Sequence, residues 1–210
     1  MIEIQNLYKK FGSNQVLSGL DLEISDGGIF AILGPNGSGK TTLIKSILGM
    51  VVPNTGNIQI QGQNIKNHWE YRQQINYLPQ IANFPGNLSV KELVRMIKDL
   101  RQKPSEEEKL IDLFGLKPFL DKKLVNLSGG TKQKVNIVLT FMFDSPLLIL
   151  DEPTTGLDPA SHIKLKTLIK EEKGKGKTIL ITSHIMQFVE EMADEIVYLL
   201  EGNIYFKGNI

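Results

Sequence analysis

The sequence predicts an α/β fold: a largely parallel sheet with helices on both faces, an N-terminal antiparallel β region and an inserted helical subdomain. After residue 127, short apolar strands at 147–150 and 178–182 alternate with helical stretches, as in parallel sheets. Near the N-terminus polar and apolar residues alternate, which is typical of half-buried antiparallel strands. Strand-forming residues are few across 83–126, where the apolar spacing is helical.

In the first part of the chain the pattern changes from alternation to short apolar runs. The expected elements are antiparallel strands at 2–7 and 20–24, a buried strand at 29–33, a helix at 43–48 and an edge strand at 56–61. A turn at 12–14 separates the first two strands, and Gly49 is expected to end the helix.

The rest of the chain is helical before it becomes α/β. The expected elements are helices at 90–100 and 106–114, a helix opened by Ser128, strands at 147–150 and 178–182 with a helix at 160–172 between them, and a terminal hairpin of 195–200 with 203–207. Pro104 and Ser105 favour the start of the second helix, and Gly174 and Gly176 favour the end of the long one.

Composition limits the classes of protein to consider. The 210 residues carry 24 Lys+Arg against 23 Asp+Glu, so a net charge of +1 gives no electrostatic case for nucleic-acid binding. The sequence contains no cysteine, which excludes disulfides and thiolate metal sites. No signal peptide is recognisable, and the apolar runs are far shorter than the roughly 18–20 residues of a membrane span. We therefore expect one domain over residues 1–210 that does not cross a bilayer.

A phosphate-binding loop lies between the predicted strand at 29–33 and the predicted helix at 43–48. Residues 34–41 read GPNGSGKT, which fits G-x-x-x-x-G-K-[ST] in full and in the expected context. Glycines let the loop turn its amide N–H groups towards phosphate, and the helix N-terminus adds partial positive charge. The predicted nucleotide-binding residues here are Gly34, Pro35, Asn36, Gly37, Ser38, Gly39, Lys40, Thr41 and Thr42.

Two acidic residues follow the apolar strand at 147–150. Asp151 emerges at the carboxyl end of that strand, where open α/β sheets bind ligands, and can position Mg²⁺ and its water shell. Glu152 is expected to face the γ-phosphate and orient the attacking water. A solvated acidic turn is the alternative for an isolated Asp-Glu pair, but the phosphate-binding loop upstream favours catalysis.

Further motifs carry a family resemblance that extends over essentially the whole chain. They are FG at 11–12, YLPQ at 77–80, LSGGTKQK at 127–134, GLD at 156–158 and ITSH at 181–184. With the loop at 34–41 and the acids, in this order, the chain resembles the ATP-hydrolysing subunit of ABC transporters.

The resemblance implies a role for each motif, with ATP and Mg²⁺ as cofactors. It implies catalysis by Glu152, His184 and Gln80, Mg²⁺ binding by Thr41, Gln80 and Asp151, adenine stacking by Phe11, and nucleotide contacts from Ser128, Gly129, Gly130 and Asp158. Tyr8 is a rival for the stacking role, and Phe11 could be a core aromatic instead. His184 could be a structural histidine at a strand end, and Ser128 a simple helix cap.

The resemblance also implies partners. The chain is expected to act as a head-to-tail homodimer that sandwiches two ATP molecules. A separate transmembrane permease would hold it at the cytoplasmic face of the membrane. The alternatives are a soluble ATPase of the same type acting on ribosomes or DNA, and a small-molecule kinase. Neutral charge opposes nucleic acid, while the 127–134 motif and His184 oppose the kinase.

Two finer expectations concern subfamily and docking. Lys134 stands where many members carry Arg, and with the segments at 71–72, 77–81 and 96–101 this motif resembles the ATPase that matures nitrous oxide reductase. The loop at 81–88 carries Phe84 and Leu88 among turn-forming residues, and we expect this loop and the first helix of the insert to form a groove for a short cytoplasmic helix of the permease. The alternative is that Phe84 packs under the helical insert.

Overall fold

The larger sheet has the strand order β10-β9-β3-β8-β7-β6 in the computed structural model, which describes residues 1–81 and 83–210. Its strands are β3 (Gly28–Leu33), β6 (Ile75–Leu78), β7 (Leu147–Asp151), β8 (Thr178–Thr182), β9 (Glu195–Leu200) and β10 (Asn203–Asn209). Neighbouring strands run parallel except for β10, which pairs antiparallel with β9 as the predicted terminal hairpin. The expectation of a largely parallel sheet is confirmed.

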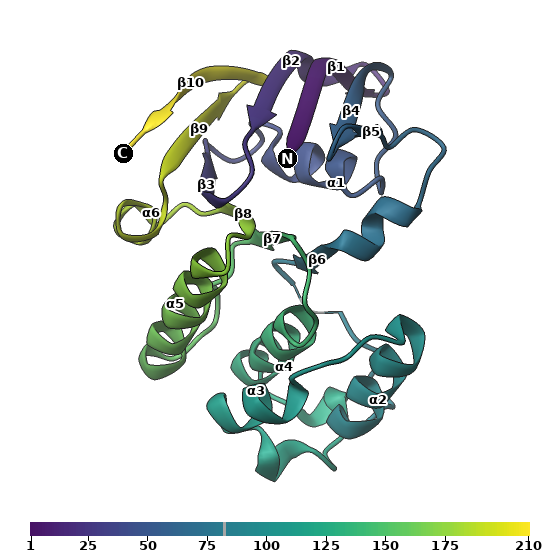
Figure 1. The fold of residues 1–210 in the computed structure, drawn as a ribbon, viewed down its shortest axis with the longest axis vertical. Helices are drawn as coiled ribbons and strands as arrows, with labels where there is room; N and C mark the ends of the chain where they lie inside the picture. Colours follow the sequence, from purple (N-terminus) through teal and green to yellow (C-terminus); the bar gives the residue numbers. More distant parts are fainter. Residues whose placement is uncertain (82) are drawn as a thin grey trace.

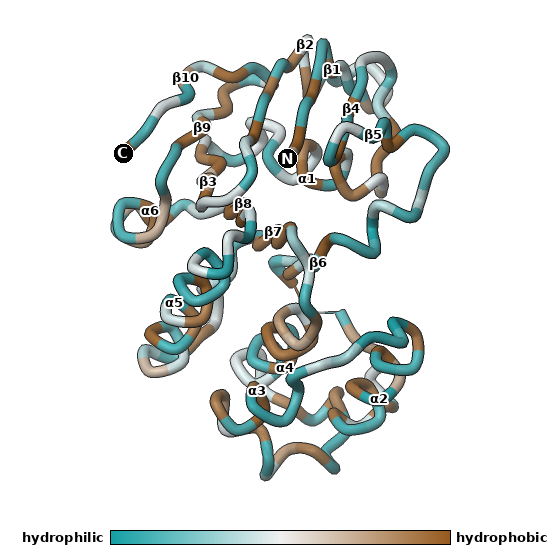
Figure 2. The backbone as a smooth tube through the Cα atoms, viewed as in Figure 1, coloured by the Kyte–Doolittle hydropathy of each residue, from teal (hydrophilic) through white to brown (hydrophobic). Residues whose placement is uncertain are grey.

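Both faces of this sheet are buried, and β7 shows why its sequence is a continuous apolar run. Leu148 and Leu150 pack into one hydrophobic core, while Leu147 and Ile149 pack into a second core across the sheet. Figure 2 shows the resulting brown stretches along β3, β7 and β8. Such strands lack the polar alternation of a half-solvated sheet because neither face meets water.

The N-terminal β region is a separate antiparallel sheet of order β2-β1-β4-β5. Its strands are β1 (Ile2–Phe11), β2 (Asn14–Ile24), β4 (Thr55–Ile60) and β5 (Gln63–Asn64), with β1 paired to both β2 and β4. The prediction that residues 56–61 form an edge strand is wrong, because the two-residue β5 pairs with the outer side of β4. A strand as short as β5 leaves no pattern of its own in the sequence.

Helices cover both faces of the larger sheet, as predicted. Helix α1 (Lys40–Ile47) packs with the antiparallel sheet on one face. Helices α5 (Pro159–Gly174) and α6 (Met186–Met192) pack on the opposite face. The carboxyl ends of β3, β7 and β8 therefore lie between a layer that contains α1 and a layer that contains α5 and α6.

A group of helices forms the lower end of the molecule in Figure 1. It comprises α2 (Val90–Arg101), α3 (Glu107–Leu113) and α4 (Gly129–Phe141), with short 3₁₀ turns at Lys117–Phe119 and Leu124–Asn126. The three helices share one core that continues to the face of β7. Helix α4 thus packs with α2 and α3, although it lies outside the predicted insert at 83–126. That this insert is a subdomain stays a prediction.

Besides β5 and the two short 3₁₀ turns, the sequence did not predict β6, α6 or the 3₁₀ helix at Glu70–Gln74. Strand β6 has four residues and is defined by its parallel pairing with β7, a long-range contact that local periodicity does not encode. Within the described parts of the chain, no helix is long and apolar enough to span a membrane.

Candidate active site

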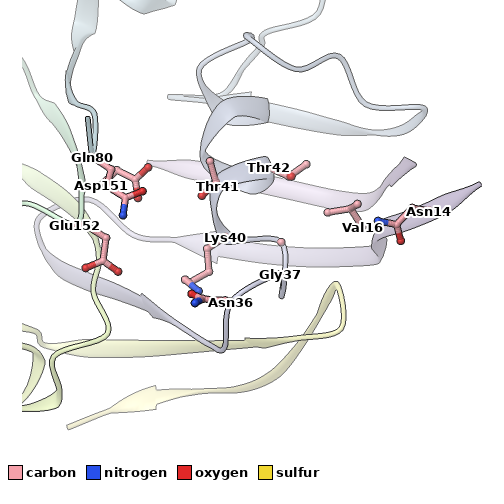
Figure 3. Close-up of a pocket in the computed structure, with 11 residues that line it drawn as sticks. Asn14, Val16, Asn36, Gly37, Lys40, Thr41, Thr42, Gln80, Asp151 and Glu152 are labelled. Carbon is pink, nitrogen blue, oxygen red and sulfur yellow. The ribbon is translucent and has the colours of Figure 1, made fainter. Parts of the chain in front are cut away.

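A cavity of about 280 Å³ opens above the carboxyl ends of the central strands. It is lined by Asn14, Val16, Asn36, Gly37, Gly39, Lys40, Thr41, Thr42, Gln80, Asp151 and Glu152. In Figure 3 the side chains of Gln80, Asp151 and Glu152 lie on one side of it, with Asn14 and Val16 on the other. Residues predicted from three separate motifs therefore meet at one place.

The loop between β3 and α1 requires glycine at two of its positions. Gly34 has φ +149°, and a Cβ built there would lie 2.1 Å from the Leu199 carbonyl oxygen. Gly39, with φ +107°, directly precedes α1, and a Cβ there would lie 2.9 Å from the Val16 carbonyl oxygen. Any other residue would push the loop away from the neighbouring backbone. The loop thus stays closed around the N-terminus of α1, where unpaired amide groups favour an anion.

The Lys40 side chain is held by backbone carbonyl groups of the same loop. Its Nζ donates to the carbonyl oxygens of Gly34 at 2.7 Å and Pro35 at 3.0 Å. Burial lowers the pKa of the Lys40 ammonium group, while the carboxylates of Glu152 and Asp151 act in the opposite direction. An anion in the cavity would add to the favourable charge around Lys40.

Two predicted loop residues have structural contacts instead of a place on the cavity wall. Ser38 is buried, and its carbonyl oxygen accepts from the Gly202 N–H at 3.1 Å, which ties the loop to the β9–β10 turn. Pro35 accepts from the Ser38 N–H at 3.2 Å and so closes the turn of the loop. Neither of these residues, nor Gly34, is among those that line the cavity.

The two acids at the end of β7 are both buried and both held by Thr182 at the end of β8. The Asp151 carboxylate accepts a hydrogen bond from the Thr182 hydroxyl. The Glu152 N–H donates to the Thr182 hydroxyl at 3.0 Å and to its carbonyl oxygen at 3.2 Å. Burial raises the pKa of Asp151, and the neighbouring Glu152 acts in the same direction. A cation beside Asp151 would stabilise its ionised form.

His184 reaches Glu152 from the loop that follows β8. Its Nδ1 lies 2.8 Å from Glu152 Oε2, although the His184 side chain is 70% exposed. Glu152 has φ +48°, a left-handed backbone that is uncommon for a residue with a side chain. The backbone therefore leaves the extended conformation of β7 at Glu152, and the imidazole contacts its carboxylate.

The residues predicted to bind Mg²⁺ form a donor set that suits this ion. Thr41 offers a hydroxyl, Asp151 a carboxylate and Gln80 an amide oxygen, and all three line the cavity. Oxygen donors of this kind, few in number, are typical of Mg²⁺ sites that share the ion with a phosphate ligand. Gln80 lies two residues beyond the end of β6, so this strand brings it to the same edge as Asp151.

The 127–134 motif lies outside the cavity. Ser128 caps α4 by accepting from the Thr131 N–H at 3.3 Å, and Ser128 and Gly129 are exposed. Gly130 approaches the Gly156 carbonyl oxygen, which a Cβ at this glycine would meet at 2.9 Å. The structure of one chain therefore does not bring this motif to the phosphate-binding loop.

An ion pair joins the 127–134 motif to Asp158. Lys134 Nζ lies 2.7 Å from Asp158 Oδ2, and Asp158 also caps α5 by accepting from the Ser161 N–H at 2.8 Å. The hydrogen bonds from Lys134 and Ser161 hold the pKa of Asp158 well below its usual range. Asp158 is thus an ionised cap outside the cavity.

The aromatic candidates differ in their surroundings. Phe11 is 51% exposed at the end of β1, with Lys9 Nζ 4.8 Å from its ring centroid. Tyr8 lies across Gly19, where a Cβ would meet the Tyr8 hydroxyl at 2.6 Å. Asn14, paired with Phe11 across the β1–β2 turn, lines the cavity. Phe11 is therefore the more exposed ring and lies next to a residue of the cavity wall, whereas Tyr8, 40% exposed, lies over Gly19.

Three residues of the site were not predicted. Asn14 and Val16 line the cavity from β2, and Thr182 holds both acids. Thr182 had a usable signal, since it ends a buried strand two residues before His184 and could have been placed beside Asp151. Asn14 and Val16 had none, because the approach of β2 to the phosphate-binding loop is a long-range contact.

Comparison with known proteins gives concordant results. The family described as ABC transporter matches residues 17–155. The Nod factor export ATP-binding protein I of Burkholderia lata is 32% identical over 213 residues, covering 99% of this chain and 70% of that protein. The lantibiotic transport ATP-binding protein SrtF of Streptococcus pyogenes is 34% identical over 208 residues, covering 97% of this chain and 89% of that protein.

Solved structures agree in fold. An ATP binding subunit of an ABC transporter superposes with a TM-score of 0.93 at 32% identity, covering 100% of this chain and 90% of that one. A dimeric ATP-binding cassette in a post-hydrolysis state, bound to ADP and Pi, gives a TM-score of 0.88 at 25% identity, covering 100% of this chain and 98% of that one.

Proposed function

Because the chain belongs to the ABC transporter family and is the ATP-binding, ATP-hydrolysing subunit of a transporter, we propose that ATP is hydrolysed in the cavity around Lys40. One observation supports this most directly. The Glu152 carboxylate, 2.8 Å from the His184 ring, lines the same cavity as Lys40 and the N-terminus of α1. A buried carboxylate that can act as a base, Glu152, thus lies in the same cavity as the proposed phosphate site at Lys40, as phosphoryl transfer to water requires.

In this proposal the chain's own residues bind phosphate, orient water and hold a proton acceptor. Lys40 and the loop amides bind the β- and γ-phosphates. Glu152 orients the attacking water, and His184 fixes the Glu152 carboxylate and meets the γ-phosphate. Mg²⁺, held by Thr41, Asp151 and Gln80, would neutralise phosphate charge.

The catalytic role of Glu152 is tested by Glu152→Gln. This variant should bind ATP with near wild-type affinity and lose turnover by about 100-fold or more, because an amide cannot polarise water as a carboxylate does. Lys40→Ala should instead weaken nucleotide binding itself. Equilibrium binding of a fluorescent ATP analogue and steady-state phosphate release separate the two effects. Hydrolysis by Glu152→Gln at the wild-type rate would contradict the assignment.

The proposed assembly is a head-to-tail homodimer in which the Ser128–Gly130 segment of each chain completes the ATP site of the other chain. The exposure of Ser128 and Gly129 outside their own chain's cavity supports it. The dimeric cassette structure among the relatives is consistent with such a pairing. In this arrangement Phe11 stacks on adenine, and Asp158 lies near the shared site.

We also propose a separate transmembrane permease, which would hold the chain at the cytoplasmic face of the membrane. The named relatives serve Nod factor export and lantibiotic transport.

The maturation of nitrous oxide reductase remains our subfamily proposal, and it rests on the residues around Lys134. Deleting the gene and measuring the copper content of that reductase would test it. A fully loaded reductase would leave export of another substrate as the function.

The contacts of Phe84 and Leu88 favour a different permease surface from the one expected from sequence. Phe84 and Leu88 are half-buried and pack against the core of the helical group, which favours the alternative given above, and Ala82 lies outside the described residues. A hollow of about 580 Å³ beside α1 offers exposed apolar side chains instead, with Val52 75% and Trp69 59% exposed. We propose that a short helix of the permease docks there, since exposed apolar side chains gathered around a hollow often mark a protein–protein contact.

A further inference from the structure

One threonine connects the two acids of the proposed hydrolysis site. Thr182 is the last residue of β8 and lies opposite Asp151 in the parallel register of β7 and β8. Its hydroxyl donates to Asp151 Oδ1 and accepts from the Glu152 N–H at 3.0 Å. The Thr182 residue is 1% exposed, so water does not compete for these bonds.

The Thr182 hydroxyl acts as both a donor and an acceptor, so it links the Asp151 side chain to the backbone of Glu152. The donor bond restricts the rotation of the Asp151 carboxylate. The acceptor bond holds the peptide of Glu152, whose φ of +48° lies outside the strand region. Glu152 therefore leaves β7 in a turn whose amide is anchored to β8. His184, two residues after Thr182, holds the Glu152 carboxylate at 2.8 Å.

We propose that Thr182 is a positioning residue for ATP hydrolysis, whose hydroxyl fixes the orientation of Asp151 and of the Glu152 turn together. The inference rests on the roles proposed above for these two acids. If the hydroxyl is removed, the backbone bond from the Glu152 N–H to the Thr182 carbonyl oxygen remains. Without the hydroxyl, Asp151 would lose its donor in a buried setting, and the turn at Glu152 would lose one of its two anchors.

The sharpest comparison is between Thr182→Ala and Thr182→Ser. Both variants remove the γ-methyl group, and only the alanine variant removes the hydroxyl. Loss of a buried hydrogen bond to a charged group predicts a kcat about 10- to 100-fold lower for Thr182→Ala, with a KM for ATP within about 3-fold of wild type. Thr182→Ser should keep kcat within about 3-fold of wild type, since the hydroxyl alone carries the effect.

Thr178 provides a control at the other end of the same strand. It is fully buried, and its hydroxyl accepts from the Gly27 N–H at 2.8 Å. Thr178→Ala and Thr178→Ser repeat the same pair of changes far from the acids. Thermal unfolding of all four variants measures any loss of stability. We expect the Thr178 pair to alter the melting temperature without separating in kcat.

A binding measurement gives a readout independent of turnover. The affinity for a fluorescent ADP analogue is measured for each variant with Mg²⁺ and with EDTA. Thr182→Ala should reduce the gain in affinity that Mg²⁺ provides and leave the EDTA value unchanged, because it disturbs Asp151 and not the phosphate-binding loop. An unchanged Mg²⁺ gain, or a kcat equal for Thr182→Ala and Thr182→Ser, would overturn the inference.

The variant Glu152→Gln, measured alongside, keeps two failures apart. If Glu152→Gln loses turnover while Thr182→Ala hydrolyses ATP normally, the positioning role is wrong and the proposed function stands. If Glu152→Gln itself hydrolyses ATP at the wild-type rate, the proposed function fails, and the inference fails with it.

Discussion

At the scale of single residues, the position of a side chain relative to the cavity separates ligand contacts from structural ones. Phe11 and Tyr8 are both exposed aromatic residues on β1, but only Phe11 pairs with Asn14, a residue that lines the cavity. Tyr8 instead covers Gly19 on the neighbouring strand. The contacts of the two rings therefore favour Phe11 for the proposed stacking on adenine and a structural role for Tyr8.

Phe11→Ala should weaken ATP binding by about 1–3 kcal/mol, the range for loss of base–aromatic stacking. Phe11→Tyr should bind ATP normally, since the ring face is kept. Tyr8→Ala should lower the melting temperature through the gap left above Gly19 and leave the affinity for ATP unchanged. Calorimetric titration with ATP and thermal unfolding measure both properties. Weaker binding in Tyr8→Ala but not in Phe11→Ala would reverse the assignment.

At the scale of elements, an ion pair joins α2 to the start of α3. Lys98 pairs with Glu107, which also accepts from the Ser105 hydroxyl at 2.6 Å. Burial raises the pKa of Glu107, but the hydrogen bonds from Lys98 and Ser105 outweigh it, so the net pKa lies below its usual value. A carboxyl group with a depressed folded-state pKa stabilises the fold above its unfolded pKa, and this contribution is lost as pH falls through the folded-state pKa.

Glu107→Gln should therefore lower the free energy of unfolding by about 1 kcal/mol at pH 7. The difference from wild type should shrink as the pH is lowered below about 4, where the wild-type carboxylate also becomes protonated. Urea unfolding across this pH range measures it. Glu108→Gln, which alters an exposed neighbour on α3, is the control. A pH-independent difference would assign the effect to packing and not to charge.

At the scale of the whole molecule, the cavity and the 127–134 motif lie apart within one chain. Ser128 and Gly129 are exposed at the N-terminus of α4, where hydroxyl and amide groups favour an anion. A two-fold pairing of two chains would use the same surface patch on each chain and bring the 127–134 motif of each to the cavity of the other. The dimer would then be the unit that hydrolyses ATP.

Glu152→Gln should accordingly become dimeric when ATP is added, because bound ATP is not consumed. Adding Ser128→Arg to this variant should prevent dimer formation by filling the anion site with a large side chain, while the monomer still binds ATP. Light scattering after size-exclusion chromatography gives the mass. A Glu152→Gln protein that stays monomeric at saturating ATP would count against the sandwich.

Docking of the permease should depend on the hollow beside α1. Val52→Asp should leave the ATPase activity of the isolated chain unchanged and prevent copurification of the membrane subunit, because it places a charge on an apolar contact. Ile163→Asp, on the exposed face of α5, is the matched control. Phe84→Asp should lower the free energy of unfolding by about 1–3 kcal/mol, since it buries a charge against the core. Copurification of the permease with Val52→Asp would exclude this surface.

The sequence alone determined the fold class and predicted most of the residues that line the candidate site, for a local reason. The phosphate-binding loop, the acids after β7, His184 after β8 and the cap of α4 are each specified within one short segment, so their patterns survive without a structure. The strands of the larger sheet were predicted where the burial of both faces leaves continuous apolar runs.

Only the tertiary structure decided how these segments meet. The pairing of β6 with β7 carries Gln80 to Asp151, the register of β7 and β8 places Thr182 against both acids, and the approach of β2 supplies Asn14 and Val16. The packing of Phe84 into the core was decided in the same way. Strand order, register and burial depend on contacts between residues far apart in the chain, and local spacing carries no record of them.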